Sequence, residues 1–298
     1  MTASPSSPIR RAALIARPTM PAALETLTEA AAWLDARGCA PTIEETSARA
    51  AGVADRWPTA TREQLAASGD VVLAFGGDGT LLDAARAVAN SSSDAPLLGV
   101  NLGRLGFLTE VGRSEMTTAL EALLAGQTHV ETRLMIAGAI RRGGAPDAAR
   151  LALNDIVVTR GALSRMIEID VIVDGQFVCH VKADGLIIAT ATGSTAYNLS
   201  AGGPIVHPSL DALVLTPIAP HTLTNRPLVL PASVRIELHP VVEPQSDLLV
   251  TFDGQLGVPL TAGDVVDVSR APRQLRLLHT SSRTHFDMLR EKLKWGNS

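Results

Sequence analysis

The chain of 298 residues contains few cysteines and few aromatic residues. Its two cysteines, Cys39 and Cys179, exclude a secreted scaffold held together by several disulfides and favour a reducing cytoplasm. Aromatic residues make up 3% of the chain, and Tyr197 is its single tyrosine. A protein that stacks nucleic-acid bases on an aromatic surface would normally carry more of them.

The sequence also lacks a long apolar run and a strong charge of either sign. No segment approaches 18 consecutive apolar residues, which excludes a membrane-spanning helix, and the apolar run at residues 12–16 is too short for a signal peptide. The formal net charge of -4 argues against binding to nucleic acid or acidic membranes through a basic surface. Hydrophobic residues form 46% of the chain, and its length suggests two domains or one large one. We therefore expect a cytoplasmic protein with no membrane or nucleic-acid partner.

The first third of the chain alternates between patterns typical of strands and of helices. Three short apolar runs predict strands, at residues 12–16, 71–75 and 96–100. Three stretches with apolar residues at helical spacing follow them, at residues 24–34, 81–88 and 116–124. Such alternation predicts an α/β domain with a Rossmann-like parallel sheet and helices on its faces.

The pattern changes after about residue 130. Residues 167–173 alternate between apolar and other side chains, as do residues 177–181, and Asp174-Gly175 between them favours a tight hairpin turn. Proline and glycine are frequent in this part, which is typical of short antiparallel strands. We therefore predict an α/β domain at residues 1–130 and a β-rich domain at residues 131–280. A last helix at residues 281–298 is expected to pack back on the first domain.

A glycine-rich loop, Gly76-Gly-Asp-Gly-Thr80, lies between a predicted strand and a predicted helix. Gly76, Gly77 and Gly79 allow the backbone to turn tightly and to approach a ligand closely. The N–H groups at the start of the following helix suit a phosphate. A plain strand–helix turn would also contain glycines, but it would leave Asp78 unexplained, because a carboxylate beside phosphate is unfavourable unless it holds a metal or removes a proton. No lysine ends the loop, so it is not the GxxxxGK[ST] phosphate loop.

A second dense stretch covers residues 184–204. Here a short apolar strand runs into hydroxyl-bearing and small residues and the single tyrosine. Such a loop offers many hydrogen-bonding groups with little steric bulk, which favours a nucleotide pocket. A structural turn is the alternative interpretation of this stretch taken alone.

Four motifs follow one another along the chain: Gly76-Gly-Asp-Gly-Thr80, Asn154-Asp155, the run 184–206 and Phe252-Asp-Gly-Gln255. Together they resemble the NAD kinase family, whose members make NADP by phosphorylating NAD. The first motif also occurs in related form in lipid kinases of the diacylglycerol type and in phosphofructokinases. The segment Thr192-Gly-Ser-Thr-Ala-Tyr197 is far more specific.

The resemblance implies a β-sandwich-like second domain and an ATP-dependent kinase that phosphorylates the 2′-hydroxyl of the adenosine ribose of NAD. It implies that Asp78 is the general base, which accepts the proton of this hydroxyl as its oxygen attacks the γ-phosphate of ATP. The phosphate and ATP contacts would come from Gly76, Gly77, Gly79, Thr80 and Arg104. For Arg104 a solvated surface position is an equal alternative. Mg²⁺ would offset the negative charge of the phosphates, and the sequence assigns it no protein ligands.

The resemblance places most NAD contacts after residue 150. Asn154 and Asp155 match paired polar residues that contact the hydroxyls and the base, and Asp184 matches a carboxylate near the nicotinamide. The residues implied for NAD binding are Asp78, Gly79, Asn154, Asp155, Arg165, Lys182, Asp184, Thr195, Ala196, Tyr197, Asn198, Leu199, Ser200 and Gln255. Some contacts come from a neighbouring subunit in this family, so a homo-oligomer, either a dimer or a tetramer, is expected.

Two other functions stay open at this point. A lipid kinase would use the same glycine-rich loop but has no need of the loop around Tyr197. A non-catalytic dinucleotide sensor would keep Tyr197 and Asn154 but could lose Asp78, which is present here. The sequence also leaves open ATP or polyphosphate as donor, the preference for NAD over NADH, inhibition by NADPH and the extent of domain motion.

Overall fold

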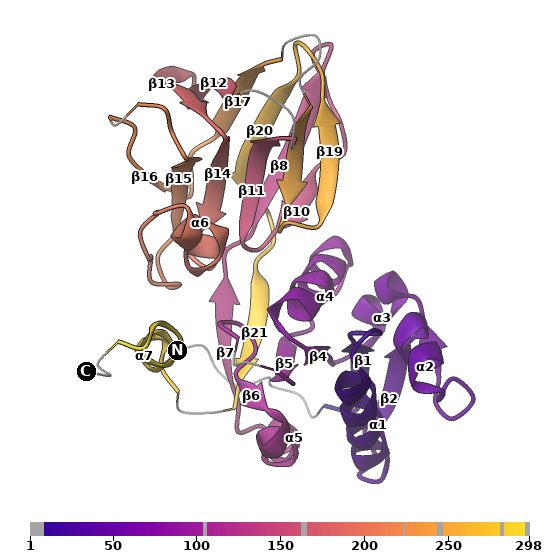
Figure 1. Cartoon of the computed structure of the whole chain (residues 1–298). Helices are drawn as coiled ribbons and strands as arrows, with labels where there is room; N and C mark the ends of the chain where they lie inside the picture. Colours follow the sequence, from indigo (N-terminus) through magenta and orange to yellow (C-terminus); the bar gives the residue numbers. More distant parts are fainter. Residues whose placement is uncertain are drawn as a thin grey trace. The chain divides into compact units, whose positions relative to one another are not determined.

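The computed structural model describes residues 9–103, 106–161, 166–222, 224–242, 247–280 and 283–295. It divides into two compact units, one formed by Met1–Thr132 with Leu275–Ser298 and the other by Arg133–Gln274. Figure 1 shows the elements in the order of the chain and labels most of the helices and strands. Arg104 and Arg165, both expected near substrate, lie outside the described residues.

The first unit is built on a largely parallel sheet with the strand order β3-β2-β1-β4-β5-β21-β7, and β6 also pairs with β5. Its strands are β1 (Arg11–Ala16), β2 (Ala40–Glu44), β3 (Thr59–Ala60), β4 (Val71–Gly76), β5 (Leu97–Asn101), β6 (Val111–Gly112), β7 (His129–Arg133) and β21 (Leu275–His279). The central pairs β2/β1, β1/β4 and β4/β5 are parallel. The three strands expected from the apolar runs are β1, β4 and β5, so the predicted parallel sheet is confirmed.

Helices pack on this sheet through their apolar residues. The helical elements of the first unit are α1 (Pro21–Asp35), α2 (Glu45–Ala51), α3 (Arg62–Ser68), α4 (Asp78–Asn90), the 3-10 helix η1 (Arg113–Glu115), α5 (Met116–Leu124) and α7 (His285–Leu293). Leu27 of α1 and Leu120 of α5 share one core cluster with Leu73 and Phe75 of β4. β4 is buried along its whole length, as expected for a strand that is covered on both faces.

The chain returns to the first unit near its C-terminus. β21 pairs in parallel with β5 and lies beside β7, although the two segments are far apart in the sequence (Figure 1). The sequence predicts that the second domain ends at residue 280. In the structure β21 belongs to the first unit, where it pairs with β5, and the second unit ends at Gln274. α7 belongs to the same unit, and Lys292 Nζ of α7 lies 5.4 Å from the centre of the Phe107 ring.

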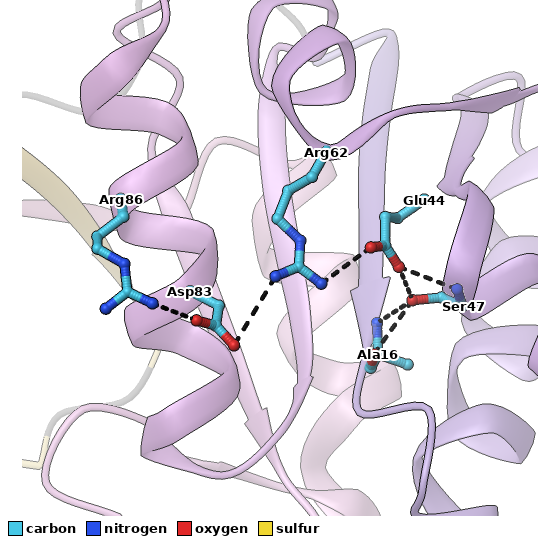
Figure 2. Close-up of polar contacts among 6 residues, drawn as sticks. All are labelled: Ala16, Glu44, Ser47, Arg62, Asp83 and Arg86. Atoms are coloured by element: carbon cyan, nitrogen blue, oxygen red, sulfur yellow. Dashed lines mark hydrogen bonds and ion pairs between the residues drawn. The ribbon is translucent and has the colours of Figure 1, made fainter. Parts of the chain in front are cut away.

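A polar network ties the carboxyl end of β2 to α3 and α4. Figure 2 shows Arg62 of α3 between Glu44, which is buried at the end of β2, and Asp83 on α4. Arg62 donates to Glu44 Oε1 at 2.9 Å and lies 3.8 Å from Asp83 Oδ2, and Arg86 also pairs with Asp83. Ser47 donates its backbone N–H to Glu44 at 2.9 Å. The helix that begins in the glycine-rich loop is therefore fixed to the neighbouring strand and helix through ionic contacts.

The second unit contains two antiparallel sheets, with the strand orders β10-β8-β20-β17-β12-β13, to which β9 adds at β8, and β16-β15-β14-β11-β18-β19. Its strands are β8 (Ile136–Arg142), β9 (Ala145–Pro146), β10 (Arg150–Ala152), β11 (Asp155–Arg160), β12 (Ile167–Val173), β13 (Gln176–Ala183), β14 (Gly185–Thr190), β15 (Ala212–Ile218), β16 (Leu228–Pro231), β17 (Ile236–Val241), β18 (Leu248–Phe252), β19 (Leu256–Leu260) and β20 (Val265–Arg270). Residues of both sheets share one apolar core, so the predicted β-rich, sandwich-like domain is confirmed.

Two features of this unit position the candidate site. β18 and β19 are joined by a three-residue turn of Asp253, Gly254 and Gln255, in which Asp253 and Gly254 have positive φ (51° and 67°) and Gln255 N–H donates to the Phe252 carbonyl at 3.2 Å. β14 is buried on both faces: Leu186 belongs to the core between the sheets, and Ile187 packs in a second cluster with Val206. The segment after β14, which contains the 3-10 helix η2 (Gly193–Thr195) and α6 (Tyr197–Ser200), therefore lies against the outer face of the second sheet.

Candidate active site

The glycine-rich loop joins β4 to α4, as the sequence predicts. Asp78 is the first residue of α4 and Gly77 is its N-cap. A Cβ at Gly76 would overlap the side chain of Thr80, so glycine is required there for steric reasons. Gly79 is exposed, whereas Asp78 and Thr80 are partly buried. The N-terminus of a 13-residue helix carries a partial positive charge, which favours an anion such as phosphate at this end.

The carboxylate of Asp78 is held by a backbone segment from another part of the first unit. Its Oδ2 accepts a hydrogen bond from Phe107 N–H at 2.8 Å. Its Oδ1 accepts from the N–H of Leu108 at 3.2 Å, from the N–H of Thr109 at 3.1 Å and from the hydroxyl of Thr109 at 2.9 Å. These four donors fix the orientation of the carboxylate, and they leave Oδ2 with fewer partners than Oδ1 among the described residues.

A second layer of contacts supports this arrangement. Asn101 Nδ2 donates to Thr109 Oγ1 at 2.9 Å, so the Thr109 hydroxyl accepts a hydrogen bond from Asn101 and donates one to Asp78 Oδ1. A Cβ at Gly106 would overlap the Asp78 carboxylate and the Thr109 hydroxyl. The sequence does not predict a role for Asn101, Gly106 or Thr109, because in the segment 101–109 it indicates only Arg104 as a site residue. The signal that could have found them is the pair of glycines around Arg104, which permits a close backbone approach.

In the second unit, the Asn154-Asp155 motif forms a turn that is organised by Asp253. The Asp253 carboxylate accepts from Leu153 N–H at 3.1 Å through Oδ2, and from the N–H groups of Asn154 and Asp155 at 2.7 and 3.2 Å through Oδ1. In return, Asp253 N–H donates to the Asp155 carbonyl at 2.9 Å. The second and fourth sequence motifs therefore meet at this turn.

The end of β14 holds the same turn through its carbonyl groups. The Thr190 N–H donates to the Asn154 carbonyl at 2.9 Å, and the Thr190 hydroxyl donates to the Leu153 carbonyl at 2.6 Å. The Thr190 hydroxyl also accepts from Gly193 N–H at 3.1 Å. A Cβ at Gly193 would lie 2.7 Å from Asn154 Cα, so glycine is needed for this close approach. The third motif thus joins the other two, and the sequence does not indicate Thr190 or Asp253 as site residues.

Asp155 has an unusual electrostatic environment. The residue is only 4% exposed. Burial raises the pKa of the Asp155 carboxyl, and the negative charge of Asp253 raises it further, to about 7. Near neutral pH this carboxyl is therefore divided between its neutral and charged forms. In the neutral form it can donate a hydrogen bond as well as accept one.

The loop around Tyr197 combines an internal scaffold with exposed side chains. Asn198 is buried, its Nδ2 donates to the carbonyls of Ser194 and Pro204 at 3.0 Å each, and its Oδ1 accepts from Thr216 at 2.6 Å. Tyr197, by contrast, is 46% exposed. Of the other residues expected to bind NAD here, Ser200 is exposed and three are partly buried, namely Thr195, Ala196 and Leu199.

The remaining expected contacts lie on strands and turns of the second unit. Lys182 Nζ of β13 pairs with Glu168 Oε1 at 2.6 Å, and Asp184 accepts from Arg160 Nε at 2.8 Å. Gln255 is exposed next to the Asp253-Gly254 turn. Lys182 and Asp184 thus already have ionic partners that the sequence did not reveal.

The described part of the chain offers no ready-made cation site and no membrane span. Among these residues there is no group of three or more His, Cys, Asp and Glu side chains that could hold a metal ion. No helix within the described ranges is both long and apolar enough to cross a membrane.

An α/β unit with a fixed aspartate at a helix N-terminus, together with a sandwich unit with a hydroxyl-rich loop, is the arrangement of a nucleotide-dependent phosphotransferase. Residues 12–128 match the family model of the ATP-NAD kinase N-terminal domain, and residues 153–280 match that of the ATP-NAD kinase C-terminal domain. The chain belongs to the ATP-NAD kinase family, and NAD kinase is its enzyme class, as the four motifs predict. The lipid kinase and the non-catalytic sensor are therefore set aside.

Individual relatives support this assignment. An NAD kinase of Geotalea daltonii is 45% identical over 290 residues, which cover 97% of this chain and 99% of the relative. An NAD kinase of Aromatoleum aromaticum is 43% identical over 291 residues, which cover 98% of this chain and 96% of the relative.

Two solved structures are similar to the whole chain. The yeast NADH kinase in complex with NADH has a TM-score of 0.86 and 25% sequence identity, covering 98% of this chain and 90% of that one. An NAD kinase of Archaeoglobus fulgidus in complex with ATP has a TM-score of 0.72 and 26% identity, covering 95% and 98%. Both similarities agree with the fold class that the sequence predicts.

Proposed function

We propose that this chain transfers the γ-phosphate of ATP to the 2′-hydroxyl of the adenosine ribose of NAD, with Asp78 as the general base. In this reaction the ribose oxygen forms a bond to the γ-phosphorus, the bond from that phosphorus to the bridging oxygen breaks, and ADP leaves. The hydroxyl proton passes to Asp78. The observation that carries the proposal is the orientation of the Asp78 carboxylate, which four donors fix at the N-terminus of α4.

The hydrogen bonds of Asp78 indicate which oxygen accepts the proton. A carboxylate has about four lone-pair sites, two on each oxygen. Oδ1 accepts three hydrogen bonds from Leu108 and Thr109, whereas Oδ2 accepts one, from Phe107. Oδ2 therefore has the greater remaining capacity, and it is the atom to which we assign proton removal.

Phosphate binding is assigned to the glycine-rich loop. Gly76, Gly77 and Gly79 allow phosphate oxygens to approach the backbone, and Thr80 adds a hydroxyl at the helix end that favours anions. Arg104 joins this set on the sequence resemblance alone. Alignment of the reacting groups and neutralisation of their charge supply the rest of the catalysis in phosphoryl transfer.

NAD binding is assigned to the second unit together with Asp78 and Gly79. The partly exposed ring of Tyr197 is suited to stack on adenine, and the Asn154-Asp155 turn offers polar groups to the hydroxyls and the base. The buried Asn198 contributes by shaping the loop, because its amide is engaged within it. The further contacts proposed are Arg165, Lys182, Asp184, Thr195, Ala196, Leu199, Ser200 and Gln255.

Mg²⁺ is proposed as the divalent ion of the reaction, and it offsets the negative charge of the phosphates when bound. Among the described residues no side-chain cluster forms a cage for it. This donor set does not fit a dedicated protein site, whereas Mg²⁺ commonly binds through substrate phosphates and water.

We also propose a cytoplasmic homo-oligomer. Both cysteines are free thiols, which suits a reducing compartment. Phe177 and Val178 on β13 and Val229 on β16 are large apolar side chains that lie exposed, Phe177 to 64%, and contact between subunits would cover such residues. Light scattering should give a dimer or tetramer, and a fully active strict monomer would refute this part.

The test of the proposed reaction is direct. Purified protein is incubated with ATP, Mg²⁺ and NAD, and NADP is followed with an NADP-specific dehydrogenase. We expect NADP to accumulate only when all three are present. Absence of NADP under these conditions would contradict the proposed function.

A further inference from the structure

We infer that Asp253 is a positioning residue, which holds the Asn154-Asp155 turn in the shape that binds the dinucleotide, with Thr190 holding the same turn from its other side. This inference rests on the proposed function of the turn. Three consecutive backbone N–H groups, those of Leu153, Asn154 and Asp155, all donate to the Asp253 carboxylate at 2.7 to 3.2 Å.

The geometry at Asp253 is specific to a carboxylate on this backbone. Its φ of 51° lies in the left-handed region, which aspartate tolerates better than most residues. The residue is 8% exposed, and its carboxylate faces backbone N–H groups of the chain rather than solvent. Because three donors converge on one group, a side chain that lacks two acceptor oxygens cannot satisfy all of them.

Thr190 completes the arrangement through the carbonyl groups of the same turn. Its hydroxyl donates to the Leu153 carbonyl at 2.6 Å and its N–H donates to the Asn154 carbonyl at 2.9 Å. The N–H groups of the turn thus donate to the Asp253 carboxylate, and the carbonyls of Leu153 and Asn154 accept from Thr190. A turn with its backbone groups satisfied on both sides has one preferred conformation, which presents the Asn154 and Asp155 side chains in a fixed position.

Asp253 also acts on Asp155 through its charge. Burial and the negative charge of Asp253 together raise the pKa of Asp155, the first residue of β11, which pairs with Ala189 of β14. Asp253→Asn removes that charge while it keeps nearly the same shape. It should therefore lower the pKa of Asp155 from about 7, an effect that a purely structural role of Asp253 does not predict.

The variants are Asp253→Asn, Thr190→Val and Thr190→Ser, with Asp211→Asn as a control at an exposed aspartate of the same unit. In Asp253→Asn the new NH2 group faces the Leu153 N–H. Both groups are hydrogen-bond donors, so the Leu153 N–H loses its acceptor. We expect its KM and its calorimetric Kd for NAD to rise roughly 10- to 100-fold, because a buried donor loses its acceptor, while the KM for ATP changes less than about two-fold. Thr190→Val should also weaken NAD binding, because it removes the hydroxyl. Thr190→Ser keeps the hydroxyl and should bind NAD nearly as tightly as the wild type.

The titration of Asp155, followed by NMR of the labelled carboxyl, gives the second readout. A lower midpoint in Asp253→Asn together with selective loss of NAD affinity supports the inference. Equal losses for NAD and ATP, or unchanged NAD affinity, would overturn it. If the wild-type chain made no NADP, the proposed function would be refuted. The NMR chemical shifts of the Leu153, Asn154 and Asp155 amides, compared between the wild type and Asp253→Asn, would still decide whether Asp253 holds the turn. If Asp253→Asn fails to fold, the Thr190 pair of variants decides.

Discussion

Asp78 in the first unit and Asp253 in the second each accept hydrogen bonds from the backbone N–H groups of three consecutive residues. For Asp78 these belong to residues 107–109, and for Asp253 to residues 153–155. The surroundings differ. Asp78 begins a helix and is partly exposed, whereas Asp253 sits in a hairpin turn and is buried. The same local contact therefore orients a carboxylate in both units: in the proposed roles, Asp78 is oriented for proton removal and Asp253 holds a turn that binds NAD.

This difference predicts opposite kinetic effects when each carboxylate is replaced by its amide. Loss of Asp78 should reduce the rate of phosphoryl transfer, because its proposed role is to remove a proton. Loss of Asp253 should reduce the affinity for NAD, because its proposed role is to hold the turn.

The largest effect is expected for Asp78→Asn. The amide keeps the size of the carboxylate but cannot accept the ribose proton, so kcat should fall by about 10² to 10⁴ while NAD binding is retained. Steady-state rates and calorimetric NAD binding measure the two quantities. Asp55→Asn, at an exposed position of the same unit, is the control and should leave both unchanged. A kcat within a few-fold of wild type would show that Asp78 is not the base.

Gly106→Ala should displace Asp78 without altering its chemistry. The added Cβ overlaps the Asp78 carboxylate, and a misplacement of about 1 Å at a reacting group can cost on the order of 10² in rate. Gly103→Ala, in the same segment, is a matched control, because the nearest atom to its Cβ is 3.9 Å away. Equal kcat values in the two variants would argue that the position of Asp78 is unimportant.

A stability prediction concerns His279 of β21, which fixes the returning C-terminal segment in the first unit. Its imidazole pairs with Glu110 and Glu131 at 2.9 Å each. Burial alone would lower the pKa of His279, but the two carboxylates outweigh it and raise the pKa from 6.5 to about 9. Since the folded state binds this proton more tightly than the unfolded state, the stabilisation is complete below pH 6.5 and is lost as the pH rises through 9.

We expect about 3 kcal/mol of unfolding free energy to disappear between pH 6.5 and 9.5 in the wild type because of His279. Urea unfolding at several pH values measures it. His279→Gln should flatten this dependence, and His221→Gln, at an exposed histidine of the second unit, should not. The same slope in wild type and His279→Gln would contradict the ion-pair interpretation.

The smallest effect is expected for Thr109→Val. This change removes one of the four hydrogen bonds to Asp78 but keeps the shape of the side chain, so kcat should fall roughly ten-fold with little change in KM. Thr109→Ser retains the hydroxyl and should recover most of the rate. Failure of serine to recover activity would assign the loss to packing rather than to the hydroxyl.

The two aspartates also illustrate how much the sequence could predict. The strand, the glycine-rich loop and the helix around Asp78 follow from local pattern, and the dipeptide Asp253-Gly254 is a turn signal of the same kind as Asp174-Gly175. Asp78 stands out in the sequence because its charge is unexpected beside a phosphate loop. The resemblance, on four motifs, was enough to predict the family and the fold of both domains.

The partners of these aspartates could not be predicted from the sequence, because they are distant along the chain. The N–H donors of Asp78 lie 29 to 31 residues away, and those of Asp253 lie 98 to 100 residues away. Backbone donors carry no side-chain signature, so no motif could indicate them. The return of β21 to the first sheet escaped prediction for a related reason, since pairing between distant strands has no local pattern.

The most direct test of the account is the rate of NADP formation at saturating ATP, measured against NAD concentration for the wild type, Asp78→Asn and Asp253→Asn. We predict that Asp78→Asn lowers the plateau and leaves the half-saturating NAD concentration nearly unchanged, whereas Asp253→Asn raises that concentration by roughly 10- to 100-fold and retains most of the plateau. Curves in which both variants lose the same quantity would contradict the division of roles between the two carboxylates.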